Sequence, residues 1–328
     1  MNNQLEFTEQ NNPSSNINNK NIITSIQTIL EFGKIGNNVF ITSIIKTEDN
    51  RIAIGYSNGS ISINSLNISE NKWTKDIHKH KAHNEEIFAL VNLSNKRLLS
   101  GETNIIVVWT FDANTITNVK TIQCKMLSIN KIISLNEQTF ATCSWDGGVR
   151  LWNDSTYNQI TILQHEHSIQ TIILLEQKNI LVTGSIHSST GIGFWNIDSY
   201  EKIKAITGYA VDLPNATIEL ADGNVACSSK NHPHPIIIIS CITFEIIKEI
   251  KLDGIMIGNF PMCTFDGHSF ICANKNKVVQ ISSVDYSVMF VGEGKGFKNN
   301  WGIIVPYEKD CFLIESGEYV SIIKVNID

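Results

Sequence analysis

Histidine pairs are the residues of this sequence whose spacing could bind a metal ion. Residues i and i+2 of a strand lie on one face, so two imidazoles at that spacing could coordinate one divalent cation. The spacing occurs in 78–83 (HKHKAH), 165–167 (HEH) and 232–234 (HPH). No cysteine pair or group of carboxylates accompanies them, and two of the three stretches fall in predicted loops. The sequence therefore predicts neither a metal site nor any other cofactor.

Motifs for nucleophilic or phosphate chemistry are weak. The chain contains no GxSxG motif, and its glycine-rich segment 292–297 (GEGKGF) lacks the GxxxxGK[ST] spacing and is followed by no helical pattern. We expect this segment to be a flexible connection between two repeats. Because Ser, His and Asp from distant parts of a chain can assemble into a triad, an enzymatic site remains the alternative to a protein without catalysis of its own.

Composition narrows the class of protein. Hydrophobic residues make up 42% of the 328 residues and charged residues 18%, which is enough apolar material for a large core. The net charge of −6, without runs of like charge, argues against a nucleic-acid or membrane-surface partner. No apolar run approaches the roughly 18 residues that span a bilayer. Seven cysteines without a CxxC pair are typical of reduced thiols, so we expect a cytoplasmic or nuclear protein.

A repeat of about 43 residues positions the candidate residues. In each unit an apolar residue closes a short strand that follows a turn, and these anchor residues are 42 to 46 positions apart. The seven anchors are Ile63, Trp109, Trp152, Trp195, Ile238, Ile281 and Ile323. Each unit also shows two further strand-like runs before the anchor, separated by turn-forming clusters, and every unit except the last shows a fourth run after it. The sequence predicts an all-β, seven-bladed β-propeller of four-stranded antiparallel blades.

One unit carries a distinctive motif around the turn before its anchor. The segment Ala141–Asn153 (ATCSWDGGVRLWN) has Thr142 leading into the turn, Asp146 in the turn and Trp152 closing the next strand. This motif resembles that of the WD-repeat β-propeller family. Two neighbouring units keep the small polar residue and the tryptophan without the turn aspartate: Ser100 with Trp109, and Thr183 with Trp195.

The histidine of the family motif has two matches. His83 occupies this position in one unit, and His165 in another, with His167 as the alternative. In the family these His, Ser/Thr, Asp and Trp residues form a hydrogen-bonded chain inside a blade. The resemblance therefore implies structural roles, in which the tryptophans fill space between strands and Asp146 orders a turn.

Ring closure needs a strand from elsewhere in the chain. The last unit ends at Asp328 with no residues left for its fourth strand, and an open sheet edge would recruit other chains. We predict that 25–31 supplies it. The propeller would then span 21–328, preceded by a disordered, Asn-rich tail at 1–20.

The family resemblance also implies where a partner would bind. In WD-repeat propellers the residue before the turn aspartate lies on the face around the central channel and often contacts partners. The matching positions and nearby loop residues here are Tyr56, Glu102, Trp145, His187, Asn274 and Trp301. Trp145 and Tyr56 are the strongest candidates, because Trp and Tyr are enriched in binding hot spots. Alternatively, Trp145 only covers the neighbouring blade.

Two functions follow as expectations. The first is a scaffold or adaptor that binds a protein or peptide on the loop face, without nucleic acid or membrane. The second is a small-ligand-binding or enzymatic propeller with a site at the central channel. Several His, Asp or Glu side chains at one level of the channel would favour the second.

Overall fold

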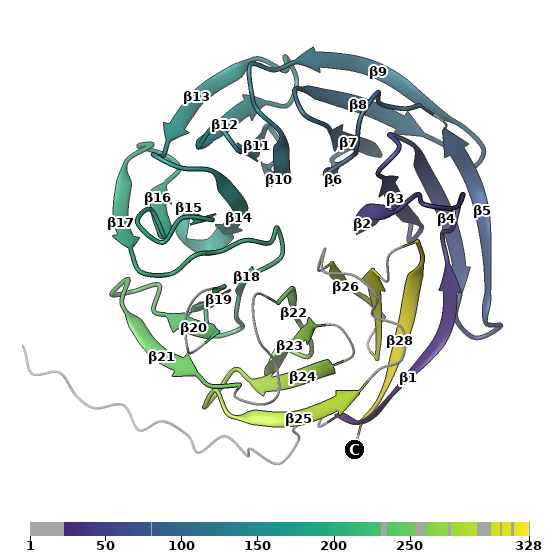
Figure 1. Cartoon of the computed structure of the whole chain (residues 1–328). Helices are drawn as coiled ribbons and strands as arrows, with labels where there is room; N and C mark the ends of the chain where they lie inside the picture. Colours follow the sequence, from purple (N-terminus) through teal and green to yellow (C-terminus); the bar gives the residue numbers. More distant parts are fainter. Residues whose placement is uncertain are drawn as a thin grey trace, which may run out of the picture.

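Seven four-stranded antiparallel sheets stand around a central opening (Figure 1). The computed structural model describes residues 23–79, 81–230, 235–252, 260–274, 277–293, 303–308, 310–315 and 318–327. Within these ranges the chain forms strands β1 to β28 and one 3-10 turn, η1 (Glu176–Lys178), and no helix could cross a membrane. The predicted all-β, seven-bladed propeller is confirmed. The predicted tail at 1–20 lies outside the described residues.

Blades 1 to 4 follow one another along the chain, each starting nearest the centre and ending at the rim (Figure 1). Blade 1 comprises β2 (Ile41–Lys46), β3 (Ile52–Tyr56), β4 (Ile61–Asn67) and β5 (Lys72–Lys79). Blade 2 comprises β6 (Ala89–Leu93), β7 (Arg97–Gly101), β8 (Ile105–Phe111) and β9 (Ile116–Gln123). Blade 3 comprises β10 (Ile129–Asn136), β11 (Thr139–Ser144), β12 (Gly148–Asn153) and β13 (Gln159–Gln164). Blade 4 comprises β14 (Ile169–Leu175), β15 (Ile180–Ser185), β16 (Ile192–Asn196) and β17 (Lys202–Ile206).

Blades 5 to 7 complete the ring, and the last takes its outer strand from the start of the chain. Blade 5 comprises β18 (Thr217–Glu219), β19 (Val225–Ser228), β20 (Ile236–Ile239) and β21 (Ile246–Ile250). Blade 6 comprises β22 (Met262–Thr264), β23 (Ser269–Asn274), β24 (Lys277–Ser282) and β25 (Val288–Glu293). Blade 7 comprises β26 (Ile304–Glu308), β27 (Cys311–Glu315), β28 (Val320–Ile327) and β1 (Ile23–Phe32).

A β-bulge accompanies every anchor. All seven anchors lie on the third strand of their blade, as predicted, and beside each one the fourth strand carries one extra residue. In blade 3, for example, Leu151 pairs with Thr161 and Trp152 with Gln159, which leaves Ile160 unpaired. The repeat that the sequence displays is thus also a repeat of backbone geometry.

These bulges explain apolar side chains that are exposed on the rim. The extra residues of four consecutive blades are Val119, Ile160, Ile203 and Ile247, and all four are exposed. A bulge bends and twists an edge strand, so that a neighbouring chain cannot extend the sheet easily. Their exposure therefore accompanies edge protection and does not by itself indicate a binding surface.

Seven apolar clusters hold the ring together, one between each pair of neighbouring blades. The tryptophans pack toward the preceding blade: Trp109 lies in the cluster of blades 1 and 2, Trp152 in that of blades 2 and 3, and Trp195 in that of blades 3 and 4. They fill space between blades, and not only between strands as the sequence suggested. Each blade is thereby stabilised by its two neighbours.

The ends of the chain meet in blade 7, as predicted. Strand β1 pairs antiparallel with β28, and Leu30, for example, lies opposite Ile322. Figure 1 shows β1 along the outer side of β28, between the rims of blades 6 and 1. Phe32 at its end is buried in the cluster of blades 7 and 1 and packs against Trp73, with ring centroids 5.7 Å apart. The first strand therefore closes both a sheet and the ring.

Aromatic residues occupy left-handed turns in four blades, and some of them contact a neighbouring blade, a feature that sequence reasoning missed. Tyr157, Tyr200, Phe244 and Tyr286 each follow the third strand of their blade and adopt positive φ angles of 56° to 62°. Tyr157 accepts a hydrogen bond from Arg97 of blade 2, and the Tyr286 hydroxyl donates to Asp222 of blade 5 at 2.7 Å. Such a backbone conformation is uncommon for a large side chain, so these contacts across the blade boundary contribute to holding it.

Blade 2 contains the hydrogen-bonded chain that the family resemblance implies. The Trp109 indole N–H donates to Ser100 Oγ at 2.6 Å, and Ser100 Oγ lies 2.5 Å from His83 Nε2. Burial lowers the pKa of His83 to about 4, so the imidazole is neutral. Because Ser100 accepts from Trp109 and can donate to Nε2, this arrangement favours the proton on Nδ1 of His83.

Blade 3 uses a methionine where blade 2 has the histidine. Trp152 donates to Thr142 Oγ1 at 3.0 Å, and Thr142 donates to the Met126 sulfur at 3.6 Å. Asp146 then pairs with Arg150, whose Nη2 lies 2.7 Å from Oδ2, and accepts the Gly148 N–H at 2.8 Å. Asp146 thus contacts both its own turn, through Gly148, and the strand that follows, through Arg150.

In blade 4, His165 is the histidine that packs against the tryptophan. His165 is buried edge-on against Trp195, with ring centroids 4.9 Å apart, whereas His167 is only partly buried. Thr183 donates instead to the Gly193 carbonyl at 3.3 Å. Among the described residues, neither His165 Nε2 nor Trp195 Nε1 has a hydrogen-bond partner. The histidine and tryptophan of this blade therefore contribute by packing, without a polar chain.

We expect removal of β1 to open the ring. Deleting residues 1–31 exposes the edge of β28 and uncovers the cluster of blades 7 and 1, so the thermal unfolding midpoint should fall by about 10 °C or more. Deleting residues 1–20 leaves β1 intact and should not change the midpoint. Differential scanning calorimetry of the two deletions provides the measurement. Equal midpoints for both would contradict the closure.

Acid should destabilise the fold through its buried histidines. Burial, and secondarily Lys202, lowers the pKa of His165 to about 3, while an unfolded histidine titrates near 6.5. Between pH 6.5 and 3 this histidine binds a proton in the unfolded state but stays neutral in the folded state. The free energy of unfolding therefore falls as the pH falls toward 3. Each such histidine lowers the free energy of unfolding by about 2 kcal/mol at pH 5.

His165→Phe keeps the ring contact with Trp195 and removes the titrating group. This variant should match the wild type in urea unfolding at pH 7 and exceed its stability by about 2 kcal/mol at pH 5. His187→Asn, at an exposed histidine of the same blade, is the control and should follow the wild type. Parallel pH profiles of His165→Phe and wild type would refute the assignment.

Candidate functional site

The central channel of the propeller contains a cavity. The cavity has a volume of about 860 Å³, and its wall comes from the first strands of the blades, chiefly β2, β6, β10 and β26. Figure 1 shows these strands facing the central opening. Trp145 and Phe88 also line it, together with Glu86 and the loop 212–215. The channel thus combines an apolar wall with a few polar groups, as binding sites commonly do.

The loop 212–215 is held inside the channel by three other blades. It belongs to the connection between β17 and β18, which runs toward the centre in Figure 1. The Pro214 carbonyl accepts hydrogen bonds from Lys131 Nζ and Thr171 Oγ1, both at 2.7 Å. The Met262 N–H donates to the Asn215 carbonyl at 2.8 Å. Blades 3, 4 and 6 therefore fix the shape of the opening.

Four charged side chains of the described residues line the channel, and three of them have partners. Lys46 donates to the Tyr307 carbonyl at 3.0 Å, Lys131 donates to Pro214, and Asp212 pairs with Lys230. Burial lowers the pKa of Lys131 to about 8. Glu86, in contrast, has no hydrogen bond or ion pair with any described residue, and burial raises the pKa of its carboxyl.

Trp145 lies at the channel with 58% of its surface exposed. It occupies the turn between β11 and β12, and its backbone N–H donates to the Leu127 carbonyl at 2.9 Å. The same turn contains Gly147, at φ +78°, where a Cβ would lie 2.6 Å from the His165 carbonyl oxygen. The turn is therefore fixed by its own residues and by both adjacent connections, while the indole remains available to solvent.

Two predicted surface residues are instead buried. Tyr56 is fully buried, and its hydroxyl lies 2.6 Å from the Gly33 carbonyl and 2.8 Å from Ser62 Oγ. Tyr56 is the last residue of β3 and does not yet belong to the turn that follows. Its side chain lies in the apolar cluster of blades 7 and 1. The prediction that it contacts a partner is wrong for this arrangement.

Glu102 is also turned inward. It is 3% exposed, its carboxylate accepts the Glu85 N–H at 2.9 Å, and Oε2 lies 3.6 Å from His83 Nδ1. The family motif places an aspartate at the next residue, which is Thr103 here. Glu102 therefore faces the histidine and supports the blade. The prediction that it contacts a partner is wrong.

The other candidates divide between the exposed surface and the undescribed residues. His187 is exposed and stacks on His167, with ring centroids 4.2 Å apart. Asn274 ends β23, but its side chain lies outside the described part of the chain, as does all of Trp301. Trp145 and His187 are therefore the predicted partner-contact residues that the structure places at the surface.

The histidine pair whose two members are both described, His165 and His167, does not form a shared ligand site. His165 packs in the core while His167 stacks on His187, so the HxH spacing separates its two members. His83 serves the chain of blade 2, and 80 and 232–234 lie outside the described residues. None of the described histidines is among the residues that line the channel.

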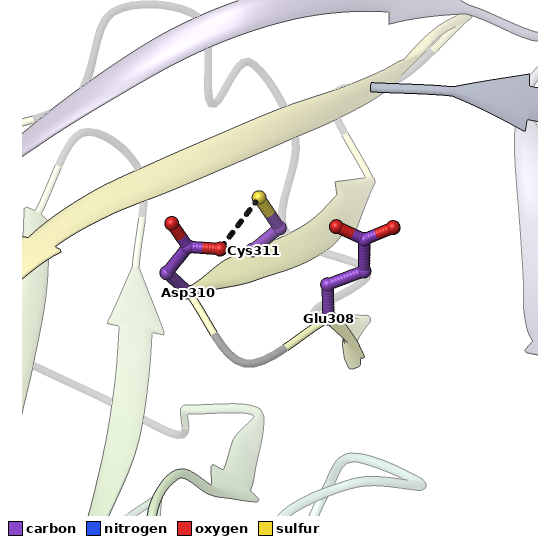
Figure 2. A group of neighbouring side chains, drawn as sticks. All are labelled: Glu308, Asp310 and Cys311. Atoms are coloured by element: carbon purple, nitrogen blue, oxygen red, sulfur yellow. Dashed lines mark hydrogen bonds between the residues drawn. The ribbon is translucent and has the colours of Figure 1, made fainter. Parts of the chain in front are cut away.

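One cluster of ligand-type atoms lies at the turn between β26 and β27. Glu308, Asp310 and Cys311 bring their ligand-type atoms within 4.8 Å of one another. Figure 2 shows the Cys311 thiol donating to Asp310, at 3.5 Å, with Glu308 beside them. Burial and the neighbouring acids raise the Cys311 pKa to about 12, and Lys324 lies 3.4 Å from Asp310. A protonated thiol and an already paired carboxylate do not favour a metal site.

Sequence reasoning missed Glu86, Phe88 and the loop 212–215. The sequence did carry a signal for Phe88, because Phe40 and Phe88 both directly precede the first strand of their blade. Both side chains also retain exposed surface. Glu86 and the loop carry no such signal. Their place in the channel depends on contacts with blades that are distant in sequence.

Comparison with known proteins identifies the architecture. No protein-family model and no curated protein matches the sequence. Among solved structures, the WD40 β-propeller domain of Doa1 superposes with a TM-score of 0.74 at 15% sequence identity, over 92% of this chain and 97% of that domain. Together with the seven blades, the ring closure and the hydrogen-bonded chain of blade 2, this similarity shows that the chain has the fold of a WD40 β-propeller.

Proposed function

We propose that this protein is a non-catalytic scaffold that binds a protein or peptide at the mouth of its central channel. The observation that carries the proposal is Trp145, whose indole is largely exposed beside an apolar cavity. Tryptophan is the residue most typical of binding hot spots. An exposed tryptophan on a fixed turn supplies a large contact area at low cost in side-chain ordering.

The rigidity of the surroundings supports this proposal. The turn of Trp145 and the loop 212–215 are held by backbone hydrogen bonds from several blades. A partner would meet a surface that is already ordered, so little conformational entropy would be lost on binding. WD40 propellers in general mediate protein interactions, and this chain shares their fold.

The channel offers less support for the alternative of an enzyme. General acid–base catalysis needs titratable groups that can exchange protons with a bound substrate. Lys46, Lys131 and Asp212 are engaged by other protein groups, which leaves Glu86 without a companion among the described lining residues. A small ligand could still fill the cavity, and the experiments below separate that case from a peptide.

A cytoplasmic or nuclear location remains part of the proposal. All seven cysteines are free and buried. Burial raises the pKa of several of these thiols to about 12, as for Cys143 and Cys272, so they act as small apolar residues. Thiols of this kind are typical of proteins from reducing compartments.

Truncation of Trp145 should abolish partner capture while the fold stays intact. Affinity purification from the native organism followed by mass spectrometry would compare wild type with Trp145→Ala. We expect the affinity of specific partners to fall at least about tenfold. The thermal midpoint should stay constant, because the side chain is mostly exposed.

Ile162→Ala provides the matched control, since Ile162 is an exposed apolar residue on the outer strand of the same blade. This variant should retain every partner. Loss of the same partners from both variants, or retention of all partners by Trp145→Ala, would show that the channel mouth is not the binding surface.

A further inference from the structure

Glu86 is a charged group that has no hydrogen-bond or ion-pair partner among the described residues. It lies in the connection before β6, two residues from Phe88, and its side chain lines the central channel. It is partly buried, burial raises the pKa of its carboxyl, and no cation in the described part of the chain opposes this shift. Removing a carboxylate from water without a partner costs free energy. A ligand that supplied a positive charge would recover that cost.

The two lysines of the channel do not fulfil this role. Lys46 donates to the Tyr307 carbonyl and lies over the Tyr307 ring, 4.9 Å from its centroid. Lys131 donates to the Pro214 carbonyl. Both ammonium groups therefore hold neighbouring blades and loops together, and neither forms an ion pair with Glu86.

Aromatic groups line the same cavity. Trp145 and Phe88 both contribute to the channel wall, and the indole of Trp145 is accessible from solvent. The face of an aromatic ring attracts a cation, most strongly for tryptophan and when water is excluded. The remaining wall is largely apolar, which strengthens any charge pair formed inside.

We propose that the channel mouth takes up a lysine or arginine side chain of the peptide partner, with its cation against Glu86 and its aliphatic stem against Trp145 and Phe88. This inference rests on the proposed function and specifies the chemistry of the partner. An acidic or purely apolar peptide segment would leave Glu86 buried without a counter-charge. The partner segment is therefore basic at one position and apolar beside it.

A random peptide library tests the inference directly. Nonapeptides that are random at every position, displayed on beads, are screened with the fluorescently labelled full chain, and the bound peptides are sequenced. The dissociation constants of the selected peptides are then measured by fluorescence polarisation. We expect the selected peptides to share a lysine or arginine, and we expect norleucine at that position to weaken binding about tenfold or more.

Substitutions of Glu86 test whether this carboxylate binds the positive charge of the peptide. Glu86→Gln should weaken the selected peptides about tenfold, and Glu86→Lys should shift selection toward peptides with Asp or Glu. Glu166→Gln is the matched control, because Glu166 is an exposed carboxylate that does not line the channel, and it should bind as the wild type does. The thermal midpoint of Glu86→Gln should equal or exceed that of the wild type, because the change removes an unpaired, partly buried charge.

The outcomes separate this inference from the proposed function. Peptides that depend on Trp145 but share no basic residue, or that bind Glu86→Gln with unchanged affinity, would overturn the inference and leave the binding site in place. If no selected peptide loses affinity in Trp145→Ala, both proposals fail. Weaker binding in Glu86→Gln together with an unchanged fold and an unaffected Glu166→Gln would support the inference.

Discussion

The burial of two apolar faces per blade is the constraint on which this structure depends. A four-stranded sheet of about 25 residues cannot cover both of its faces, so each blade needs a neighbour on either side. Seven inter-blade clusters meet this need, and the ring has no terminal blade because β1 completes the sheet of β26 to β28. Closure by the first strand is therefore a condition for the stability of the whole ring, including blades that are remote from it in sequence.

Polar interactions vary from blade to blade, whereas the packing and the backbone geometry recur. Blade 2 has a chain of His83, Ser100 and Trp109, and blade 3 replaces the histidine with Met126. Blade 4 keeps the histidine and the tryptophan without hydrogen bonds between them. All seven blades, however, share the anchor on the third strand and the bulge beside it. Apolar burial together with edge geometry thus defines the repeat, and the hydrogen-bonded chain is one of several ways to satisfy buried polar groups.

Most charged side chains of the channel already have partners within the protein. Lys46, Lys131 and Asp212 all line the opening, yet each is engaged in linking strands or loops. Trp145 and Glu86 remain available for a ligand, one as an apolar surface and the other as a charge. A rigid wall with one exposed aromatic residue and one uncompensated carboxylate is suited to selecting a partner by shape and by a single positive charge.

The sequence by itself determined the number of blades, their strands and the closing strand, because each follows from short-range patterns. Anchors spaced by about 43 residues and turn-forming clusters specify hairpins locally, and strand periodicity is a property of neighbouring residues. Exposure at the channel was decided only by the tertiary structure. Tyr56 and Trp145 were equivalent by counting from the anchor, yet one ends a buried strand and the other enters a turn. Glu86 carries no local signal at all. Whether a charge is paired depends on groups brought by other blades, and chain-distant contacts of that kind leave no periodic trace in a single sequence.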